Sequence, residues 1–129
     1  MAYPYRRIIK PPLGSRIDRS HPLSKRLVGF WLMNEKAGNK LYDLSGKNNT
    51  GTITNATWKN AASCHSGSCL SFNGSTSVVT APKISTIAPT SAYSISFWVE
   101  WQGNVQQIYG GLFHQQSASN DRMGIFITS

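Results

Sequence analysis

LVGFWLMNEKAGNKLYDLSGKNNTG, residues 27–51, is the stretch that decides the fold of this 129-residue chain. At its start both alternating sets of residues are apolar. This pattern predicts a strand at 27–35 whose two faces are both covered. Residues 34–39 predict a turn, because they end in Gly and Asn, which tolerate positive φ. Residues 40–44 are a short extended piece, and the Ser, Gly and Asn of 45–50 predict a loop.

The remainder of the chain contains several short runs with the pattern of β strands. These runs lie at 51–58, 68–72, 76–81, 93–101, 109–115 and 123–128. The Asn73-Gly74 pair tolerates left-handed backbone and predicts a hairpin turn between the second and third runs. A loop rich in Pro, Ser and Thr is expected at 82–91, and a turn at 117–122. Because no segment has a helical period of useful length, the expected class is an all-β sandwich or barrel.

The basic charge is concentrated in the first 26 residues. The formal net charge is +8, and residues 1–26 hold seven Lys or Arg against Asp18 alone. The four prolines of this segment predict an extended arm, because proline fixes φ and donates no hydrogen bond. We therefore expect an arm at 1–26 and a domain at 27–129. The arm either is a solvated tail or lies along its own domain or a partner. The candidate docking residues are Tyr3, Tyr5, Arg6, Arg7 and Lys10.

Several classes of protein are disfavoured by the sequence. No run approaches the ~18 apolar residues of a spanning helix, so no membrane span is expected. The first residues lack the apolar core of a signal peptide, so we expect synthesis in a cytoplasm. The five acidic residues form no close pair on one strand, and the three histidines stand in unrelated segments. We therefore expect no enzymatic activity.

The order of several motifs along the chain resembles a known family. The motifs are His21-Pro22-Leu23, Leu27-Val28-Gly29-Phe30-Trp31, Tyr42-Asp43-Leu44-Ser45-Gly46, Phe72-Asn73-Gly74 and the run at 93–99. Together they resemble the laminin G-like domains of the concanavalin A-like lectin/glucanase superfamily, in the versions found in bacterial and bacteriophage proteins. The resemblance covers about residues 21–128. It implies a concanavalin A-like jelly-roll sandwich.

Two features depart from the family pattern. Asn73 stands where the family often has Asp, which removes a charge from any calcium site at that turn. The chain is also short for a full sandwich of this type, and the usual later strands are missing. We expect a partner chain or a symmetry mate to complete the sandwich, because a half sandwich leaves unpaired edges. The alternatives are a reduced sandwich or a fragment of a longer protein.

Aromatic and amide side chains are the candidates for sugar binding. An aromatic face can stack on the apolar face of a sugar ring, with amide hydrogen bonds around it. The candidates are Trp58, Trp101, Gln102 and Asn104. For any single Trp a place in the core is the stronger interpretation, because aromatic side chains dominate cores by area.

Oxygen-bearing residues in the neighbouring loops form a candidate Ca²⁺ site. Asn34, Glu35 and Asp43 supply the amide and carboxylate oxygens that Ca²⁺ prefers, and superfamily members often bind Ca²⁺ near such loops. The alternative is that Asp43 and Ser45 satisfy turn amides, as these residues often do before Gly. We favour this second interpretation.

The two cysteines, Cys64 and Cys69, are separated by four residues. This is not a common zinc spacing, and His65 alone does not complete a tetrahedral site. A disulfide is geometrically feasible if the chain turns back at Gly67. Cytoplasmic synthesis favours free thiols, whereas oxidation on an extracellular particle favours a disulfide, so both states stay open.

The sequence therefore predicts a non-catalytic carbohydrate-binding or adhesion module on an assembled particle, at the surface of a bacteriophage virion. Its expected partners are other virion proteins in a multimer, and glycans; nucleic acid is not expected. The first alternative is a purely structural capsid-decoration or tail protein that docks through its arm. The second is a fragment of a glycan-degrading enzyme.

Overall fold

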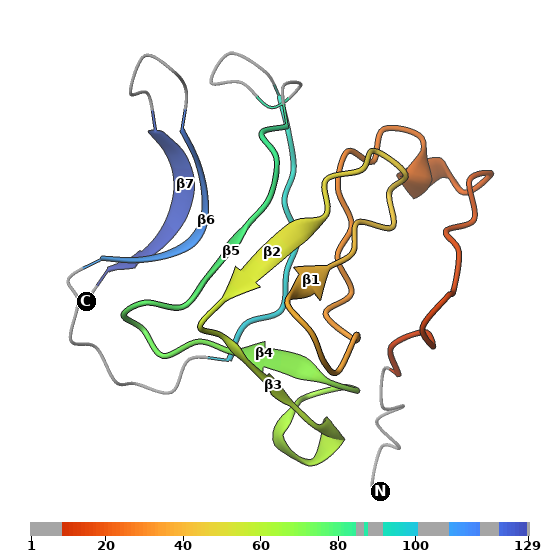
Figure 1. Cartoon of the computed structure of the whole chain (residues 1–129). Coiled ribbons are helices and arrows are strands. Elements are labelled where there is room, and N and C mark those ends of the chain that lie inside the picture. The colour runs from red at the N-terminus through yellow and green to blue at the C-terminus, as the bar shows by residue number, and fades with distance from the viewer. Residues whose placement is uncertain (1–8, 85–86, 88–91, 101–108, 117–121, 129) are drawn as a thin grey trace, which may run out of the picture. The chain divides into compact units, whose positions relative to one another are not determined.

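The computed structural model describes residues 9–84, 87, 92–100, 109–116 and 122–128 (Figure 1). The chain forms two compact units, Met1–Pro82 and Lys83–Ser129. The division between these units falls at Pro82, at the start of the predicted loop. The arm belongs to the first unit because Lys10 and Pro11 are hydrogen-bonded to the body of that unit.

The first unit contains a three-stranded antiparallel sheet with the strand order β1-β2-β5. Leu41 of β1 pairs with Gly51 of β2, and Ile53 of β2 pairs with Val79 of β5. Leu41 and Ile53 are the buried apolar side chains of this sheet, at 2% and 7% exposure. The strand bounds are Lys40–Leu41 for β1, Gly51–Thr54 for β2 and Val78–Thr80 for β5.

A second, two-stranded antiparallel sheet of the first unit pairs β3, Thr57–Lys59, with β4, Cys69–Ser71. The single strand predicted at 51–58 is therefore wrong. Asn55 takes a left-handed φ of 55° just after β2, and β3 continues in a different sheet. Asn tolerates this region better than most residues, because its short polar side chain can hydrogen-bond locally.

The hairpin predicted at Asn73-Gly74 is also wrong. The flanking strands β4 and β5 pair with β3 and β2 respectively, and not with each other. Asn73 instead organises the connecting loop through its Oδ1, as Asx side chains commonly do. This oxygen accepts hydrogen bonds of 2.9 to 3.0 Å from the backbone N–H groups of Ser75, Thr76 and Ser77.

Residues 27–35 belong to no β ladder, so the first predicted strand is wrong. Positions 27–33 are half-buried, and Met33 takes a φ of 53° that interrupts an extended course. The backbone of Phe30 is held by the loop after β1. Its N–H donates to Asp43, and its carbonyl accepts from the N–H of Leu44.

The second unit contains an antiparallel β hairpin of β6 and β7, with an irregular register between Gly111 and Phe113. Both strands were predicted from the sequence and are confirmed. The strand predicted at 93–101 is wrong over its described part, because residues 92–100 join no ladder. The bounds are Tyr109–Gln116 for β6 and Arg122–Thr128 for β7.

The described part of the chain is rich in β structure, as predicted. Its helices are two short 3₁₀ turns, η1 at Pro22–Ser24 and η2 at Ala61–Ser63. No α-helix occurs among the described residues. Within the same residues, no helix has the length and apolar character needed to cross a membrane.

Candidate functional site

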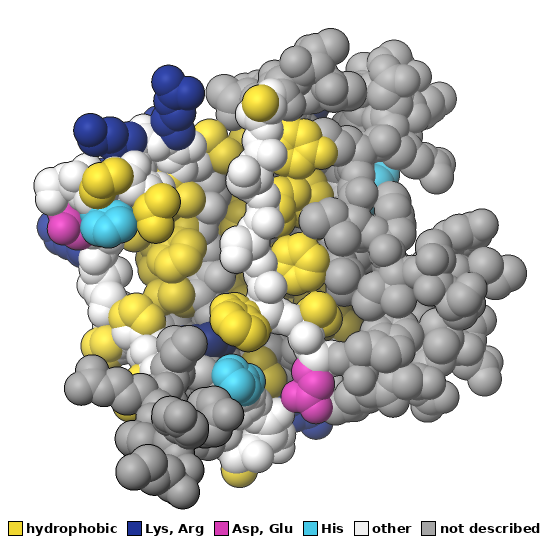
Figure 2. Space-filling view, turned by 180° about the vertical axis from the view of Figure 1, so that it is seen from behind, with side chains coloured by type: hydrophobic (Ala, Val, Ile, Leu, Met, Phe, Trp, Pro, Cys, Tyr) yellow, Lys and Arg dark blue, Asp and Glu magenta, His cyan; other side chains and the backbone are white. Residues whose placement is uncertain are grey.

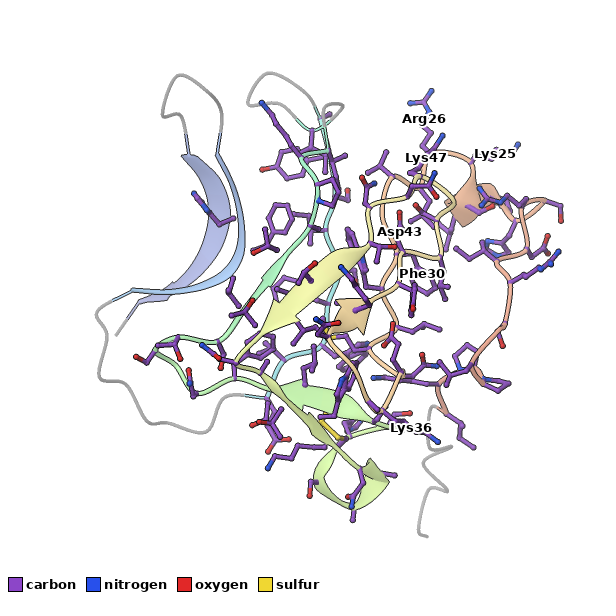
Figure 3. All side chains as sticks on the ribbon, viewed as in Figure 1. Lys25, Arg26, Phe30, Lys36, Asp43 and Lys47 are labelled. Atoms are coloured by element: carbon purple, nitrogen blue, oxygen red, sulfur yellow. A yellow bond between two sulfur atoms is a disulfide. The ribbon has the colours of Figure 1, made fainter. Side chains whose placement is uncertain are left out.

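Asp43 organises the loop at 43–49, hereafter the Asp43 loop (Figure 3). Its Oδ1 accepts hydrogen bonds from the N–H groups of Phe30 at 3.0 Å and Ser45 at 2.8 Å. Its Oδ2 accepts from the Ser45 hydroxyl at 2.8 Å and the Asn49 N–H at 2.9 Å. Burial raises the pKa of Asp43, but these hydrogen bonds outweigh it and hold the pKa below its ordinary value.

The Asp43 loop is also hydrogen-bonded to residues 28–31, which precede it in the chain. The indole N–H of Trp31 donates to the Asn49 carbonyl at 2.9 Å, and the Asn49 side-chain amide donates to the Val28 carbonyl at 2.7 Å. The Trp31 ring lies so close to Gly29 that a Cβ at this position would collide with it. An added Cβ at position 29 would therefore force the Trp31 ring to shift from the place where it is hydrogen-bonded to Asn49.

The three residues proposed for Ca²⁺ do not form a fitting ligand set. Each Asp43 oxygen already accepts two hydrogen bonds, so neither has a lone pair left for a cation. The Asn34 amide donates to the Pro11 carbonyl at 2.7 Å, and Glu35 Oε1 accepts from the Tyr42 N–H at 2.8 Å. No group of three or more His, Cys, Asp or Glu in the described residues could hold a metal ion. Asp43 instead accepts hydrogen bonds from turn amides, which is the alternative to a Ca²⁺ site that the sequence favoured.

A different ion, the ammonium group of Lys10, fixes the arm to the body. Lys10 Nζ donates to the carbonyls of Ser68 at 2.6 Å and Met33 at 3.2 Å. The Lys10 backbone N–H donates to the Ser66 hydroxyl at 3.1 Å. Burial lowers the pKa of Lys10, and the nearby charge of Glu35 opposes part of that effect. We call this set of contacts the Lys10 anchor. Lys10 is thus engaged within its own chain, and not free for the partner docking that the sequence suggested.

A disulfide closes the segment that receives Lys10. Cys64 and Cys69 form a disulfide, with their Cα atoms 5.8 Å apart. The sequence left open whether these cysteines are free thiols or a disulfide, and the structure shows the disulfide. The bridged loop contains Ser66 and the Ser68 carbonyl, two acceptors of the Lys10 anchor. Closing a loop this short is worth about 2 kcal/mol in the chain-entropy model. The disulfide therefore restrains the segment that holds the arm.

The anchored arm and the body enclose a hollow of about 160 Å³, which we call the arm hollow. The arm contributes Pro12, Leu13 and Gly14, and the body contributes Leu32, Asn34, Glu35, Tyr42 and Leu44. Most of these side chains are apolar. Tyr42 is 56% exposed, which leaves much of its ring accessible.

Glu35 contributes a carboxylate with one unsatisfied oxygen to the lining of the arm hollow. Its Oε1 is occupied by the Tyr42 N–H, but its Oε2 is buried and has no hydrogen-bond partner. An unsatisfied buried acceptor costs about 1 to 3 kcal/mol, and more when it is charged. The Oε2 atom is closed to solvent, so a ligand in the hollow reaches it only when the neighbouring side chains shift.

The structure places the other predicted site residues apart from this hollow or leaves them undescribed. Trp58 lies in β3, half-buried, and its indole N–H donates to the Gly38 carbonyl at 2.9 Å. This hydrogen bond therefore stabilises the turn at 34–39. The candidates outside the described residues are Trp101, Gln102, Asn104, Tyr3, Tyr5, Arg6 and Arg7.

Comparison with known proteins gave no match to a family model, a curated protein or a solved structure. The laminin G-like resemblance stays a prediction. Sequence reasoning did not find the arm hollow, because Leu13 and Tyr42 carry no motif that links them. The sequence left open whether the arm is a solvated tail or lies along its own domain or a partner.

Proposed function

We propose that this chain is a non-catalytic carbohydrate-binding or adhesion module of a laminin G-like sandwich, displayed on an assembled particle such as a bacteriophage virion. We also propose that the arm hollow receives a sugar ring. The observation that carries the proposal is the pairing of apolar walls and an accessible Tyr42 ring with the partnerless oxygen of Glu35. A sugar ring offers a complementary pair of features, an apolar C–H face and hydroxyl donors.

The size of the arm hollow supports a single ring as its occupant. An apolar cavity of about 150 Å³ is enough to bind a six-membered carbon ring. The arm hollow, at about 160 Å³, is of that size and is smaller than the sites of drug-sized ligands, about 300 to 1,000 Å³. Adjacent sugars of a longer glycan would extend along the surface.

Glycan-array screening of the whole chain, followed by titration of the glycans that bind, tests the proposal. Tyr42→Ala and Glu35→Gln should each weaken binding about tenfold, because loss of one good contact is worth about 1.4 kcal/mol. Phe72→Ala is the matched control, since Phe72 is a similarly exposed aromatic of the first unit outside the hollow. Absence of glycan binding, or release of sugar from a polysaccharide, would contradict the proposal.

The Lys10 anchor favours a second candidate, a structural particle protein that docks through its arm. The anchor fixes Lys10 to the body, and the aromatic and basic residues of 1–8 precede it in the sequence. Deletion of residues 1–8 separates the candidates. Loss of particle association with unchanged glycan affinity supports a docking arm beside a binding module, whereas loss of association in a chain that binds no glycan supports the structural role alone.

A further inference from the structure

Four basic side chains gather at the end of the first unit that carries η1 and the Asp43 loop. The Arg19 guanidinium lies against Gly46, the residue that precedes Lys47 in the chain. Lys25 and Arg26 lead into Val28, whose carbonyl is bonded to Asn49 of the same loop. Figure 3 places Lys25, Arg26 and Lys47 together at this end, and Figure 2 shows Lys and Arg side chains projecting from one corner of the surface. We call Arg19, Lys25, Arg26 and Lys47 the basic end.

The charges of the basic end are available to a partner. All four side chains are exposed. The two carboxylates closest to them in sequence are occupied elsewhere: Asp43 by its four internal donors, and Asp18 by the N–H and hydroxyl of Ser20 at 2.9 and 2.6 Å. Within the described part of the chain, none of the four basic side chains forms an ion pair.

We propose that the basic end binds the acidic groups of an anionic polysaccharide. This inference rests on the proposed glycan-binding function and adds a class of ligand to it, a glycan that carries carboxylate or sulfate groups. The two Arg side chains offer planar forks that match such oxyanions in a bidentate manner, and the two Lys side chains act as point charges. The energy of such contacts comes largely from exposed charges, so binding should weaken as salt rises.

The surroundings of the basic end favour a polysaccharide over nucleic acid or membrane. Readers of single-stranded nucleic acid combine cations with aromatic stacking platforms, and readers of duplex DNA insert a helix or ribbon into a groove. The basic end is built from loops and from the three-residue turn η1, whose sequence, Pro-Leu-Ser, contains no aromatic residue. Membrane-surface binding usually uses an amphipathic helix with a broad apolar face, whereas η1 offers Leu23 as its one large apolar side chain.

The test titrates the full chain with a matched pair of polymers, dextran and dextran sulfate, with polygalacturonate as a carboxylate polymer. Expected are tighter binding to the acidic polymers and a loss of about tenfold or more in the Lys25→Gln/Arg26→Gln/Lys47→Gln variant at low salt. Lys36→Gln is the matched control, because Figure 3 places Lys36 away from the other three labelled basic side chains. A single-stranded DNA oligonucleotide and vesicles of anionic lipid complete the set of probes.

The outcomes separate this inference from the proposed function. If neutral glycans bind in the array while the acidic polymers bind no better than dextran, the anionic-glycan inference fails and the glycan-binding function stands. If no glycan of either kind binds, both fail. Preferential binding of DNA or vesicles, lost in the triple variant, would overturn the polysaccharide assignment. A loss of affinity per charge removed that is as large in Lys36→Gln as in the triple variant would also overturn it, because the effect would then follow net charge and not position.

Discussion

In both the Asp43 loop and the Lys10 anchor, one charged side chain forms hydrogen bonds with several groups, but the two charges are of opposite sign. In the first, a carboxylate collects four hydrogen-bond donors. In the second, an ammonium group collects two backbone carbonyls. Each ion satisfies backbone groups in a part of the unit where strands of two to four residues leave many such groups unpaired. The buried polar residues Asn34, Ser45, Asn49 and Ser68 all belong to one of these two centres or adjoin it.

The two centres differ in the sequence distance over which they act. The donors to Asp43 lie within 13 residues of it, whereas the acceptors of Lys10 lie 23 to 58 residues away. The Asp43 loop is therefore a local structure that orders its own chain segment. The Lys10 anchor is a tertiary contact, because it joins the arm to two segments that only the fold brings together. The arm hollow depends on this second centre, since the anchor positions residues 12–14.

The largest expected effect is that of Asp43→Ala on stability. The substitution removes four hydrogen bonds to a charged acceptor and leaves the N–H groups of Phe30, Ser45 and Asn49 without it. We expect the free energy of unfolding to fall by about 3 kcal/mol, because these donors lose the acceptor that replaced water in the folded chain. Urea unfolding measures the loss. Asp18→Ala is the control, since Asp18 is an exposed acid with local contacts. Equal losses in the two variants would contradict an organising role for Asp43.

A smaller effect is expected from Lys10→Met, which keeps the apolar stem and removes the ammonium group. The carbonyls of Met33 and Ser68 lose a donor, and we expect a loss of about 1 to 2 kcal/mol. Faster proteolysis of the arm should accompany this loss, because the contact is tertiary. Lys25→Met is the matched control, an exposed lysine outside the anchor. An unchanged cleavage rate in Lys10→Met would show that the anchor does not hold the arm.

The smallest expected effect is a difference in acid sensitivity. The pKa of Asp43 is lower in the folded chain than the ordinary 3.8, so the folded state binds fewer protons than the unfolded state in that range. The stabilisation from ionised Asp43 is complete well above 3.8 and is lost as the pH falls through the lowered folded value. The native chain should therefore lose more stability than Asp43→Asn between about pH 6 and pH 3. Unfolding curves at both pH values measure the difference, and parallel losses would contradict it.

The local part of the fold was predictable from the sequence because it depends on residue chemistry over short distances. Asp43 before Ser and Gly indicated a turn-forming carboxylate, and the structure shows that arrangement. The strands β6 and β7 followed from their apolar patterns. Asn73-Gly74 was misread because an Asn side chain can close a loop as well as start a hairpin, and the sequence does not record which strands are paired.

The candidate site was less predictable than the fold. The sequence offered Trp58 as an aromatic face for a sugar ring, but its indole N–H donates to the Gly38 carbonyl. Glu35 was chosen as a metal ligand, and the structure instead leaves one of its oxygens buried without a donor beside an apolar hollow. The residue type was informative in both cases, but the role depended on which groups the fold brought near.

By itself, the sequence determined a β-rich chain with a basic, Pro-rich arm and a tightly turned loop around Asp43. These properties depend on composition and on contacts between near neighbours, whose geometry the chain itself limits. Only the tertiary structure decided that Lys10 is held beside the disulfide loop, that the arm and the body line a hollow, and that Lys25, Arg26 and Lys47 lie at the same end of the first unit. These arrangements bring together residues that are far apart in the sequence, and their formation depends on the packing of the whole unit.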